Sequence, residues 1–375
     1  MTTAISMSVF ERQIGRSARA ERTPLGCTFE ITPTCNLRCK FCYVAIDPYE
    51  GPYLTTSQVC TVLDRIADAG VLWLTLTGGE IFSRRDFPEI YAHARKRGFL
   101  VTLYSNGTMI TDRIASLLAE HPPFSMEVSI YGADAEHYEG TTSIPGSFAR
   151  FVRGIDHLVA AGVPLALKCP VSTLTQDHVP QLVAFARARG LPFKYDPTID
   201  PRHSGGQEPT LYRIEPRDLA KVRDTIYELK NGRPPEQHEG PLPECSMTDP
   251  DATSEELYTC GAGRVSFFVD ALGHASHCII DREPAFPILD MPWEELWMEM
   301  GSWVTQPLPA EAPCSGCSLR QNCGNCPARS RLATGSPYLK DTYHCDVTHA
   351  EHGLPPAAHP DYRAGARPLG ACVAG

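Results

Sequence analysis

Short apolar segments alternate with amphipathic segments from residue 27 to about residue 230 of this 375-residue chain. Several of the short segments are near-continuous runs of apolar or β-branched residues, which is typical of strands buried in a parallel sheet. Strands are predicted at residues 27–31, 71–77, 99–104, 124–130, 163–171 and 191–195. The pattern therefore predicts an α/β fold.

The segments between these strands have the spacing of helices. Thr55 and Gln58 form a capping-box pair, and Gly70 ends the helix that follows. That helix has an apolar face made of Val59, Val62, Leu63 and Ile66. Further helices are predicted to begin at Asp86, Thr111, Ser147 and Thr175, and a sixth covers residues 216–230. Six β-α units predict a parallel sheet with right-handed crossovers, either open or curved into a partial (β/α)6 barrel related to the eight-fold barrel.

The remaining segments depart from this alternation. Residues 1–25 contain four arginines and little apolar periodicity, so we expect a loose N-terminal arm before a first domain at residues 26–231. Residues 232–256 are rich in prolines and acids, which predicts a linker. A cysteine-rich domain is expected at residues 257–350, followed by a mobile tail at residues 351–375.

The amino-acid composition narrows the range of possible partners and cellular locations. With 34 Lys+Arg against 44 Asp+Glu the net charge is -10, which argues against a nucleic acid or an anionic membrane as partner. The start of the chain lacks the apolar region of a secretory signal, and no apolar run is long enough to span a bilayer. We therefore expect a soluble, cytoplasmic protein. In that compartment its 15 cysteines favour metal or redox chemistry over disulfides.

Three cysteines follow the first predicted strand: Cys35, Cys39 and Cys42, with the spacing C-x3-C-x2-C. Three thiolates on one loop can bind three irons of a cubane cluster and leave the fourth iron open to a small molecule. A zinc site short of one ligand, or three unrelated thiols, are the alternatives. The loop leaves the carboxyl end of a parallel strand, where ligands gather in such folds.

The second predicted strand ends in Gly78, Gly79 and Glu80. Two glycines allow a ligand to approach the backbone closely, and the carboxylate can hold an ammonium group. A glycine turn with a solvated glutamate is the alternative. The position beside the cysteine loop favours a binding site.

These two motifs, with Phe41 before the third cysteine, resemble the radical S-adenosylmethionine (radical SAM) superfamily. In that family three cysteines hold a [4Fe-4S] cluster whose open iron chelates S-adenosylmethionine. Reductive cleavage then produces a 5′-deoxyadenosyl radical that abstracts a hydrogen atom from the substrate. The resemblance implies that Gly78, Gly79 and Glu80 bind the amino group of the cofactor and that Phe41 packs near the adenine. It also implies cofactor contacts for Ser129 and Asn106, for which a role as simple turn residues is the alternative.

A second array of cysteines lies between residues 260 and 345. Cys260 and Cys278 flank Gly273 with the spacing C-x12-G-x4-C. Four more cysteines read C-x2-C-x5-C-x2-C, and Cys345 comes last; the four are Cys314, Cys317, Cys323 and Cys326. The four alone are compatible with a zinc knuckle. Iron–sulfur ligation explains more of the array, because it also uses the three other cysteines.

This array resembles the SPASM extension of radical SAM enzymes, with one residue fewer before Cys326. The resemblance implies two auxiliary [4Fe-4S] clusters. The outer one would be ligated by Cys314, Cys317, Cys323 and Cys345. The inner one would be ligated by Cys260, Cys278 and Cys326, with Cys245 as its fourth ligand or with an open iron. Cys27, Cys60, Cys169 and Cys372 match no motif.

The resemblance implies an enzyme that modifies a ribosomally made peptide, by a crosslink or an oxidation. A short segment precedes the first strand, so we expect a separate leader-recognition protein, together with a reducing partner such as flavodoxin or ferredoxin. A small-molecule enzyme of heme biosynthesis and a non-catalytic iron–sulfur or zinc regulator are the alternatives.

Two positions depart from the pattern of the family. Tyr131 occupies a position where many SPASM enzymes have aspartate, and Ile279 follows Cys278 where sulfatase maturases have an acid. No catalytic residue is assigned.

Overall fold

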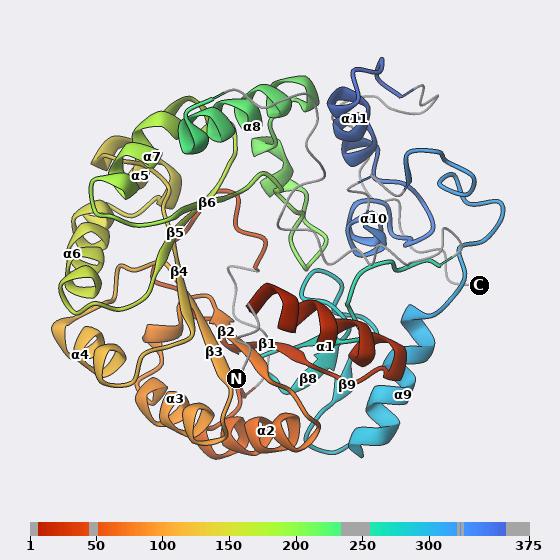
Figure 1. The fold of residues 1–375 in the computed structure, drawn as a ribbon, viewed down its shortest axis with the longest axis horizontal. Coiled ribbons are helices and arrows are strands. Elements are labelled where there is room, and N and C mark those ends of the chain that lie inside the picture. Colours follow the sequence, from red (N-terminus) through yellow and green to blue (C-terminus); the bar gives the residue numbers. More distant parts are fainter. Residues whose placement is uncertain (1–6, 45–51, 234–255, 321–322, 324–325, 358–375) are drawn as a thin grey trace, which may run out of the picture.

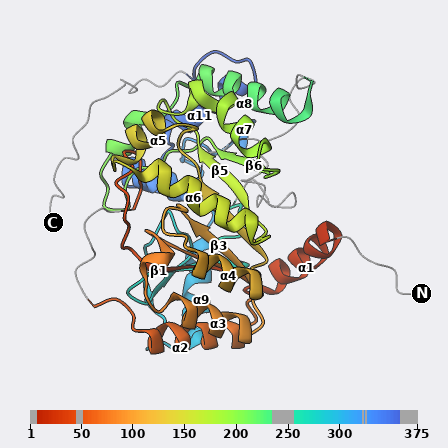
Figure 2. The same cartoon turned by 90° about the vertical axis from the view of Figure 1, so that its left-hand side faces the viewer.

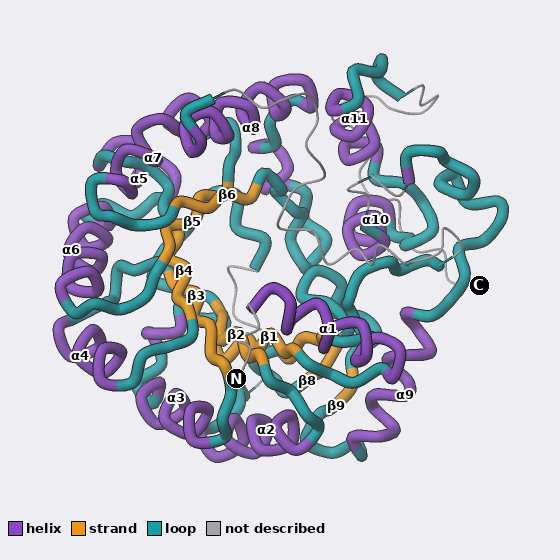
Figure 3. Tube along the Cα trace, viewed as in Figure 1, coloured by secondary structure: helices purple, strands orange, loops and turns teal. Residues whose placement is uncertain are grey.

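A nine-stranded sheet, curved and open, is the centre of the molecule. The computed structural model describes residues 7–44, 52–233, 256–320, 323 and 326–357. The strand order is β6-β5-β4-β3-β2-β1-β7-β8-β9. Neighbouring strands from β6 through β1 to β7 are parallel, whereas β8 and β9 are antiparallel additions. Figure 3 shows that the row of strands does not close on itself. The prediction of an open or partial barrel is confirmed.

All six predicted strands are present, each within three residues of its expected ends. They are β1 (Gly26–Thr32), β2 (Trp73–Gly78), β3 (Leu100–Ser105), β4 (Ser125–Ser129), β5 (Ala166–Pro170) and β6 (Phe193–Asp196). Three more strands, which the sequence pattern did not reveal, extend the sheet beyond β1: β7 (Ser266–Val269), β8 (His274–Ser276) and β9 (Phe286–Pro287). The cysteine-rich part of the chain therefore pairs directly with the first strand of the barrel.

Helices cover the convex side of the sheet (Figure 1). They are α2 (Thr56–Asp68), α3 (Phe87–Lys96), α4 (Asp112–Glu120), α5 (Ala135–Thr142), α6 (Ser147–Ala160), α7 (Val179–Arg187) and α8 (Pro216–Asn231). Three short 3-10 helices lie at Ile81–Ser83, Gln176–His178 and Glu208–Tyr212. The C-terminal part adds α9 (Trp293–Val304), α10 (Pro327–Thr334) and α11 (Thr342–Glu351). No helix in the described ranges is long and apolar enough to cross a membrane.

Helix starts follow the sequence signals except at Asp86 and Thr175. Thr175 makes no capping hydrogen bond and precedes a 3-10 helix at Gln176–His178, so α7 begins only at Val179. The Thr55–Gln58 capping box is formed, and the Thr111 side chain accepts a hydrogen bond from the Ile114 amide. Asp86 precedes α3, as predicted, but makes no capping hydrogen bond. Its carboxylate instead accepts hydrogen bonds from Arg84 and Thr56. The ion pair with Arg84 therefore displaces the predicted cap.

Alternate residues of the parallel strands face opposite sides of the sheet. One side is apolar and packs under the helices; Phe29, Leu74, Leu76, Leu103 and Val128 belong to it and are fully buried. The other side carries a row of hydroxyl residues in register across four strands: Thr28, Thr75, Thr102 and Ser125. The concave side of the barrel is therefore polar, which suits a binding site better than a packed core.

The expectation of a loose N-terminal arm was wrong for residues 7–21, which form the helix α1 (Met7–Glu21). Its last turn is fastened to the C-terminal part of the chain. Arg19 donates to the carbonyls of Thr259 and Cys260, and Arg22 donates to those of Gly263 and Trp297. These side-chain bonds leave no signal in hydrophobic periodicity, so the sequence pattern missed them. Figure 2 shows α1 at the side of the barrel, with its start pointing away from the sheet.

Ion pairs join the barrel to the C-terminal part. Glu30 on β1 pairs with Arg282 at 2.7 Å, and Asp200 after β6 pairs with Arg329 on α10 at 2.8 Å. Helix α11 packs against α8. The predicted linker at residues 232–256 lies outside the described residues except for its two ends, and most of the tail at 351–375 also lies outside them.

Candidate cofactor and cluster site

The loop that contains Cys35, Cys39 and Cys42 begins directly after β1. Two backbone hydrogen bonds fasten it to the end of α5: Arg38 N–H donates to the Thr142 carbonyl at 3.0 Å, and Lys40 N–H to the Thr141 carbonyl at 3.1 Å. The carbonyls at a helix C-terminus have no partner within the helix. The cysteine loop supplies these partners, so α5 holds the loop in place.

The three thiols of this loop are half-buried and close enough to influence one another. Burial raises the pKa of Cys35 to about 11, and the negative charges of Glu80 and Cys42 raise it further. Burial also raises the pKa of Cys39, with contributions from Cys42 and Cys35. Burial raises the pKa of Cys42 as well. Three thiols in such surroundings become thiolates only beside strong positive charge, which iron supplies. The site therefore fits an iron–sulfur cluster.

Gly78 and Gly79 are required by the cysteine loop itself. A Cβ at Gly79 would lie 2.5 Å from the carbonyl oxygens of Pro33 and Thr34, and one at Gly78 would lie 2.2 Å from that of Thr32. Gly79 N–H donates to the Thr32 carbonyl and Glu80 N–H to the Thr34 carbonyl, both at 2.8 Å. The two motifs seen in the sequence are therefore one structural unit.

The alternative interpretation, in which Glu80 is a solvated residue of a glycine turn, is wrong, because only 1% of Glu80 is exposed. Its carboxylate accepts hydrogen bonds from Ser105 Oγ at 2.8 Å, Asn106 N–H at 2.7 Å and Phe82 N–H at 3.2 Å. Burial raises the pKa of Glu80 to about 7, although these hydrogen bonds lower it. The carboxyl group therefore needs little free energy to ionise when a cation is near.

Asn106 connects the cysteine loop to the end of β3. Its Nδ2 lies 3.7 Å from Cys35 Sγ and donates to Asn36 Oδ1 at 3.0 Å. Its Oδ1 accepts from the Thr108 amide at 2.9 Å. Phe41 is buried with its ring 5.9 Å from that of Tyr131, and Ser129 ends β4 in register with Lys168. All six residues expected near the cofactor thus lie around the carboxyl ends of β2, β3 and β4 or in the cysteine loop.

The C-terminal cysteines fall into two groups. Burial raises the pKa of Cys314, and the charges of Cys323 and Cys317 add to it. Burial raises the pKa of Cys345 to about 11, with contributions from Cys323 and Cys314. These four cysteines are therefore neighbours. In addition, Thr348 Oγ1 donates to Cys323 Sγ at 3.2 Å.

The second group contains Cys260, Cys278 and Cys326. Burial raises the pKa of Cys278 to about 11, and the charge of Cys260 raises it further. Burial also raises the pKa of Cys326, Arg329 lowers it, and Cys278 and Cys260 raise it. The motif pair C-x2-C at residues 323–326 is thus divided between the two groups. Cys245 lies outside the described residues.

No three His, Cys, Asp or Glu side chains among the described residues converge on a point where one metal ion could bind. In a cubane each thiolate binds its own iron, so its ligands need not converge in this way. Division of the four central cysteines between two groups also argues against a zinc knuckle. None of the 13 described cysteines forms a disulfide.

Arg329 is a residue of this region that the motifs did not single out. It lies within one turn of Cys326, and its positive charge lowers the pKa of both Cys326 and Cys278. The short spacing to Cys326 is the only signal of its position in the sequence.

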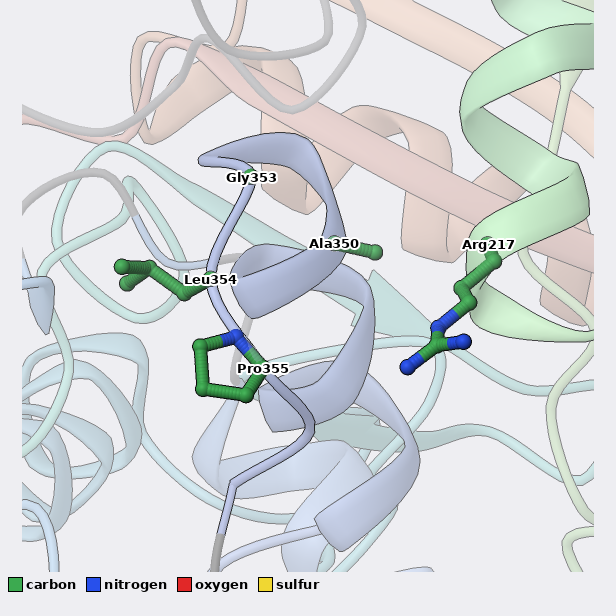
Figure 4. A pocket seen from close by; sticks show the side chains of 5 residues that line it. All are labelled: Arg217, Ala350, Gly353, Leu354 and Pro355. Carbon is green, nitrogen blue, oxygen red and sulfur yellow. The ribbon is translucent and has the colours of Figure 1, made fainter.

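A separate surface hollow of about 390 Å³ lies between α8 and the end of α11 (Figure 4). Its lining residues, such as Arg217 and Leu354, include no candidate site residue.

An open parallel barrel with a cysteine loop after its first strand places a candidate iron–sulfur site at the carboxyl ends of the strands. The model of the radical SAM superfamily matches residues 29–186 of this chain. Residues 29–186 therefore form a radical SAM domain. Streptococcus suis SuiB and anSMEcpe, whose folds are similar to that of this chain, were solved with S-adenosylmethionine bound.

Similar proteins cover nearly the whole chain. The AdoMet-dependent heme synthase of Methanosarcina barkeri is 26% identical over 84% of this chain and 95% of that protein. Mycofactocin maturase MftC of Mycobacterium ulcerans is 28% identical over 90% of both chains. Streptococcus suis SuiB, solved with its precursor peptide SuiA, has a TM-score of 0.69 at 14% identity, covering 92% of this chain and 82% of SuiB. The similarity to SuiB shows that the fold is shared.

Proposed function

We propose that this radical SAM enzyme modifies a ribosomally made peptide, by forming a crosslink or by an oxidation. The observation that carries the proposal is the unit formed by the cysteine loop and the Gly78–Glu80 turn, set at the edge of a polar barrel interior. Relatives named as peptide maturases support the choice of substrate class.

The roles of individual residues belong to this proposal. Cys35, Cys39 and Cys42 ligate the cluster, and Gly78, Gly79 and Glu80 bind the amino group of S-adenosylmethionine. The raised pKa of Glu80 supports this role, because an ammonium group stabilises its ionised form. Ser129, Asn106 and Phe41 complete the cofactor site. When bound, the cluster supplies the electron that cleaves the cofactor.

Two auxiliary [4Fe-4S] clusters are also part of the proposal. The first is held by the group of Cys314, Cys317, Cys323 and Cys345, and the second by Cys260, Cys278 and Cys326. The support is the separation of the seven thiols into two groups, in which burial raises the pKa values of Cys278, Cys314, Cys326 and Cys345. Cys245 completes the second set, or one iron stays open to substrate.

We further expect that a separate protein binds the leader part of the peptide and that flavodoxin or ferredoxin delivers the electrons. The test uses anaerobically reconstituted enzyme, a reductant, S-adenosylmethionine and short peptides encoded beside the gene. The expected result is 5′-deoxyadenosine together with a peptide whose mass has changed. Formation of 5′-deoxyadenosine without any change in these peptides would contradict the peptide substrate but not the radical chemistry.

A second candidate is a small-molecule enzyme of tetrapyrrole metabolism. Relatives named AdoMet-dependent heme synthase, which align with 82–84% of this chain, favour it. A porphyrin substrate converted in the same assay, with the peptides unchanged, would select this candidate over the first.

A further inference from the structure

Two lysines face the concave side of the barrel from the strands β5 and β6. Lys168 on β5 and Lys194 on β6 are direct register partners, and Lys168 is also in register with Ser129 at the end of β4. The residues on either side of Lys168, Leu167 and Cys169, are fully buried under the helices. Because side chains alternate along a strand, the Lys168 side chain is directed to the opposite, concave face.

Glu127 on β4 joins the two lysines into one cluster. Lys194 Nζ donates to Glu127 Oε1 at 2.6 Å, and Lys168 Nζ lies 3.6 Å from Glu127 Oε2. The second distance is longer than a hydrogen bond, so Lys168 interacts with this oxygen by charge alone. Tyr104 on β3 is the register partner of Glu127, and Lys168 Nζ lies over its ring, 5.8 Å from the centre. Two ammonium groups and one carboxylate leave the three charged side chains with a net positive charge.

This arrangement is unfavourable for folding alone. Like charges side by side on neighbouring strands destabilise a sheet. Both lysine side chains are only partly exposed, so water screens their repulsion incompletely. The chain as a whole is acidic, with a net charge of -10, and the inner face of β5 and β6 therefore differs in sign from the rest of the molecule. A ligand with a negative charge would relieve the repulsion between the lysines.

The cluster lies far from the turn proposed to bind the amino group of the cofactor. Gly78–Glu80 is at the end of β2, whereas Lys194 is on β6, the edge strand at the other end of the parallel row (Figure 1). Neighbouring strands are about 4.8 Å apart, so four strand spacings separate β6 from β2 by roughly 19 Å along the sheet. The exposed ring of Tyr104 lies between them on the same face. The lysines are therefore placed to hold a molecule other than the cofactor.

We propose that Lys168 and Lys194 bind a carboxylate group of the substrate peptide and so select and orient the peptide in the barrel. Each ammonium group has three donors, and its hydrogen bonds to a carboxylate are strengthened by charge. Glu127 holds the lysines in place in the free enzyme and competes with the incoming carboxylate for them. An acidic side chain and the C-terminus of a peptide offer the same chemistry. The inference rests on the proposed function, because it takes the barrel interior as the place of the peptide.

Fluorescence anisotropy of short labelled peptides with full-length reconstituted enzyme tests the proposal without turnover. The first peptide has a glutamate and an amidated C-terminus, the second a glutamine and a free C-terminal carboxylate, and the third a glutamine and an amidated C-terminus. At least one acidic peptide is expected to bind about tenfold more tightly than the neutral third peptide. The peptide that does so identifies the source of the carboxylate. Equal affinities for all three peptides overturn the proposal.

The combined substitutions Lys168→Met and Lys194→Met should abolish this preference, because methionine keeps an unbranched side chain without charge. Lys221→Met in α8, where 76% of the side chain is exposed, is the matched control and should retain the preference. A preference that disappears in the control as well overturns the proposal, because overall charge would explain it. A preference that persists in the double variant also overturns it, and a simultaneous loss of affinity for S-adenosylmethionine would then assign the lysines to the cofactor.

Glu127→Gln is a second variant, for the case in which the double variant fails to fold. It removes the charge that competes for the two lysines, so affinity for the acidic peptide should rise above the wild-type value. An unchanged or lower affinity overturns the proposal, because it is the result expected of a merely structural ion pair. If the enzyme modifies none of the peptides encoded beside its gene, the proposed function fails, whereas the preference in binding is measured independently of that assay.

Discussion

At the residue scale, the glycines and the glutamate of the Gly-Gly-Glu turn have different tasks. Gly78 and Gly79 leave room for the backbone of the cysteine loop, and their missing side chains are explained by contacts within the protein. Glu80 is buried beneath them and accepts three hydrogen bonds. The motif therefore shapes the loop that holds the cluster as well as the place for the cofactor.

Gly79→Ala should prevent the cysteine loop from packing against the Gly-Gly-Glu turn, because the new Cβ would lie 2.5 Å from two carbonyl oxygens of the loop. Overpacking of this kind costs about 1–3 kcal/mol. We expect a lower melting temperature and a loss of iron at the first cluster. Gly140→Ala in α5 is the control, because nothing lies within 4 Å of its added Cβ. An alanine at position 79 with full iron content would contradict the close contact.

Glu80 should make cofactor binding depend on pH. Its pKa of about 7 lies above the ordinary value of 4.5, so below pH 7 the free enzyme holds a proton that must leave before the carboxylate can pair with an ammonium group. Affinity for S-adenosylmethionine should rise with pH up to about 7, by at most roughly tenfold per pH unit. Calorimetric titrations at pH 6 and 7 measure this, with Glu80→Gln as the control. Parallel profiles for the two proteins would argue against the role of Glu80.

At the scale of elements, the ends of helices hold the functional loops. The C-terminal carbonyls of α5 bind the cysteine loop, and the last turn of α1 binds the segment around Cys260. Gly301 in α9 has no Cβ, and the Arg22 guanidinium occupies the space where one would be. Helix α1 is thus a fixed part of the C-terminal half, although it comes first in the chain.

Arg22→Ala should loosen α1. The change removes two hydrogen bonds from a charged group to carbonyls and a cation–π contact with Trp297 at 5.1 Å. Hydrogen bonds of this type contribute about 1.5–3 kcal/mol each, so local protection against hydrogen exchange should fall clearly in α1. Arg16→Ala, at an exposed position of the same helix, should leave exchange unchanged. Equal protection in all three proteins would show that α1 is held by other contacts.

At the scale of the whole molecule, the cysteine-rich part extends the sheet of the barrel and is not a separate domain joined only by a linker. Strand β7 pairs with β1 in parallel, and the ion pairs Glu30–Arg282 and Asp200–Arg329 join the two parts. Arg329 also lowers the pKa of the Cys326 thiol more than any other charged group does. Contacts between the two parts therefore reach the auxiliary cysteines.

Asp200→Ala should destabilise this connection. The carboxylate is 6% exposed and pairs with Arg329 at 2.8 Å. Removing one partner of a buried pair costs about 3–5 kcal/mol. Chemical denaturation should show the loss, and a double-mutant cycle with Arg329→Ala should recover part of it. Strict additivity of the two substitutions would mean that the pair contributes no coupling.

Iron and sulfide content tests the number of clusters. Three cubanes require about twelve irons and about twelve sulfides per chain. Replacement of Cys35, Cys39 and Cys42 by alanine should leave about eight of each. A wild-type value of about four irons with bound zinc would instead indicate a radical SAM core beside a zinc module.

Sequence alone determined the six β-α units, the cysteine loop and the Gly-Gly-Glu turn, because hydrophobic periodicity and motif spacing are local properties of the chain. Tertiary structure decided that α1 is fastened to the segment around Cys260 and that β7 extends the sheet next to β1. It also decided that Cys323 and Cys326, only three residues apart, belong to different groups. These features depend on which distant segments meet in space, and no local pattern of residues encodes such contacts.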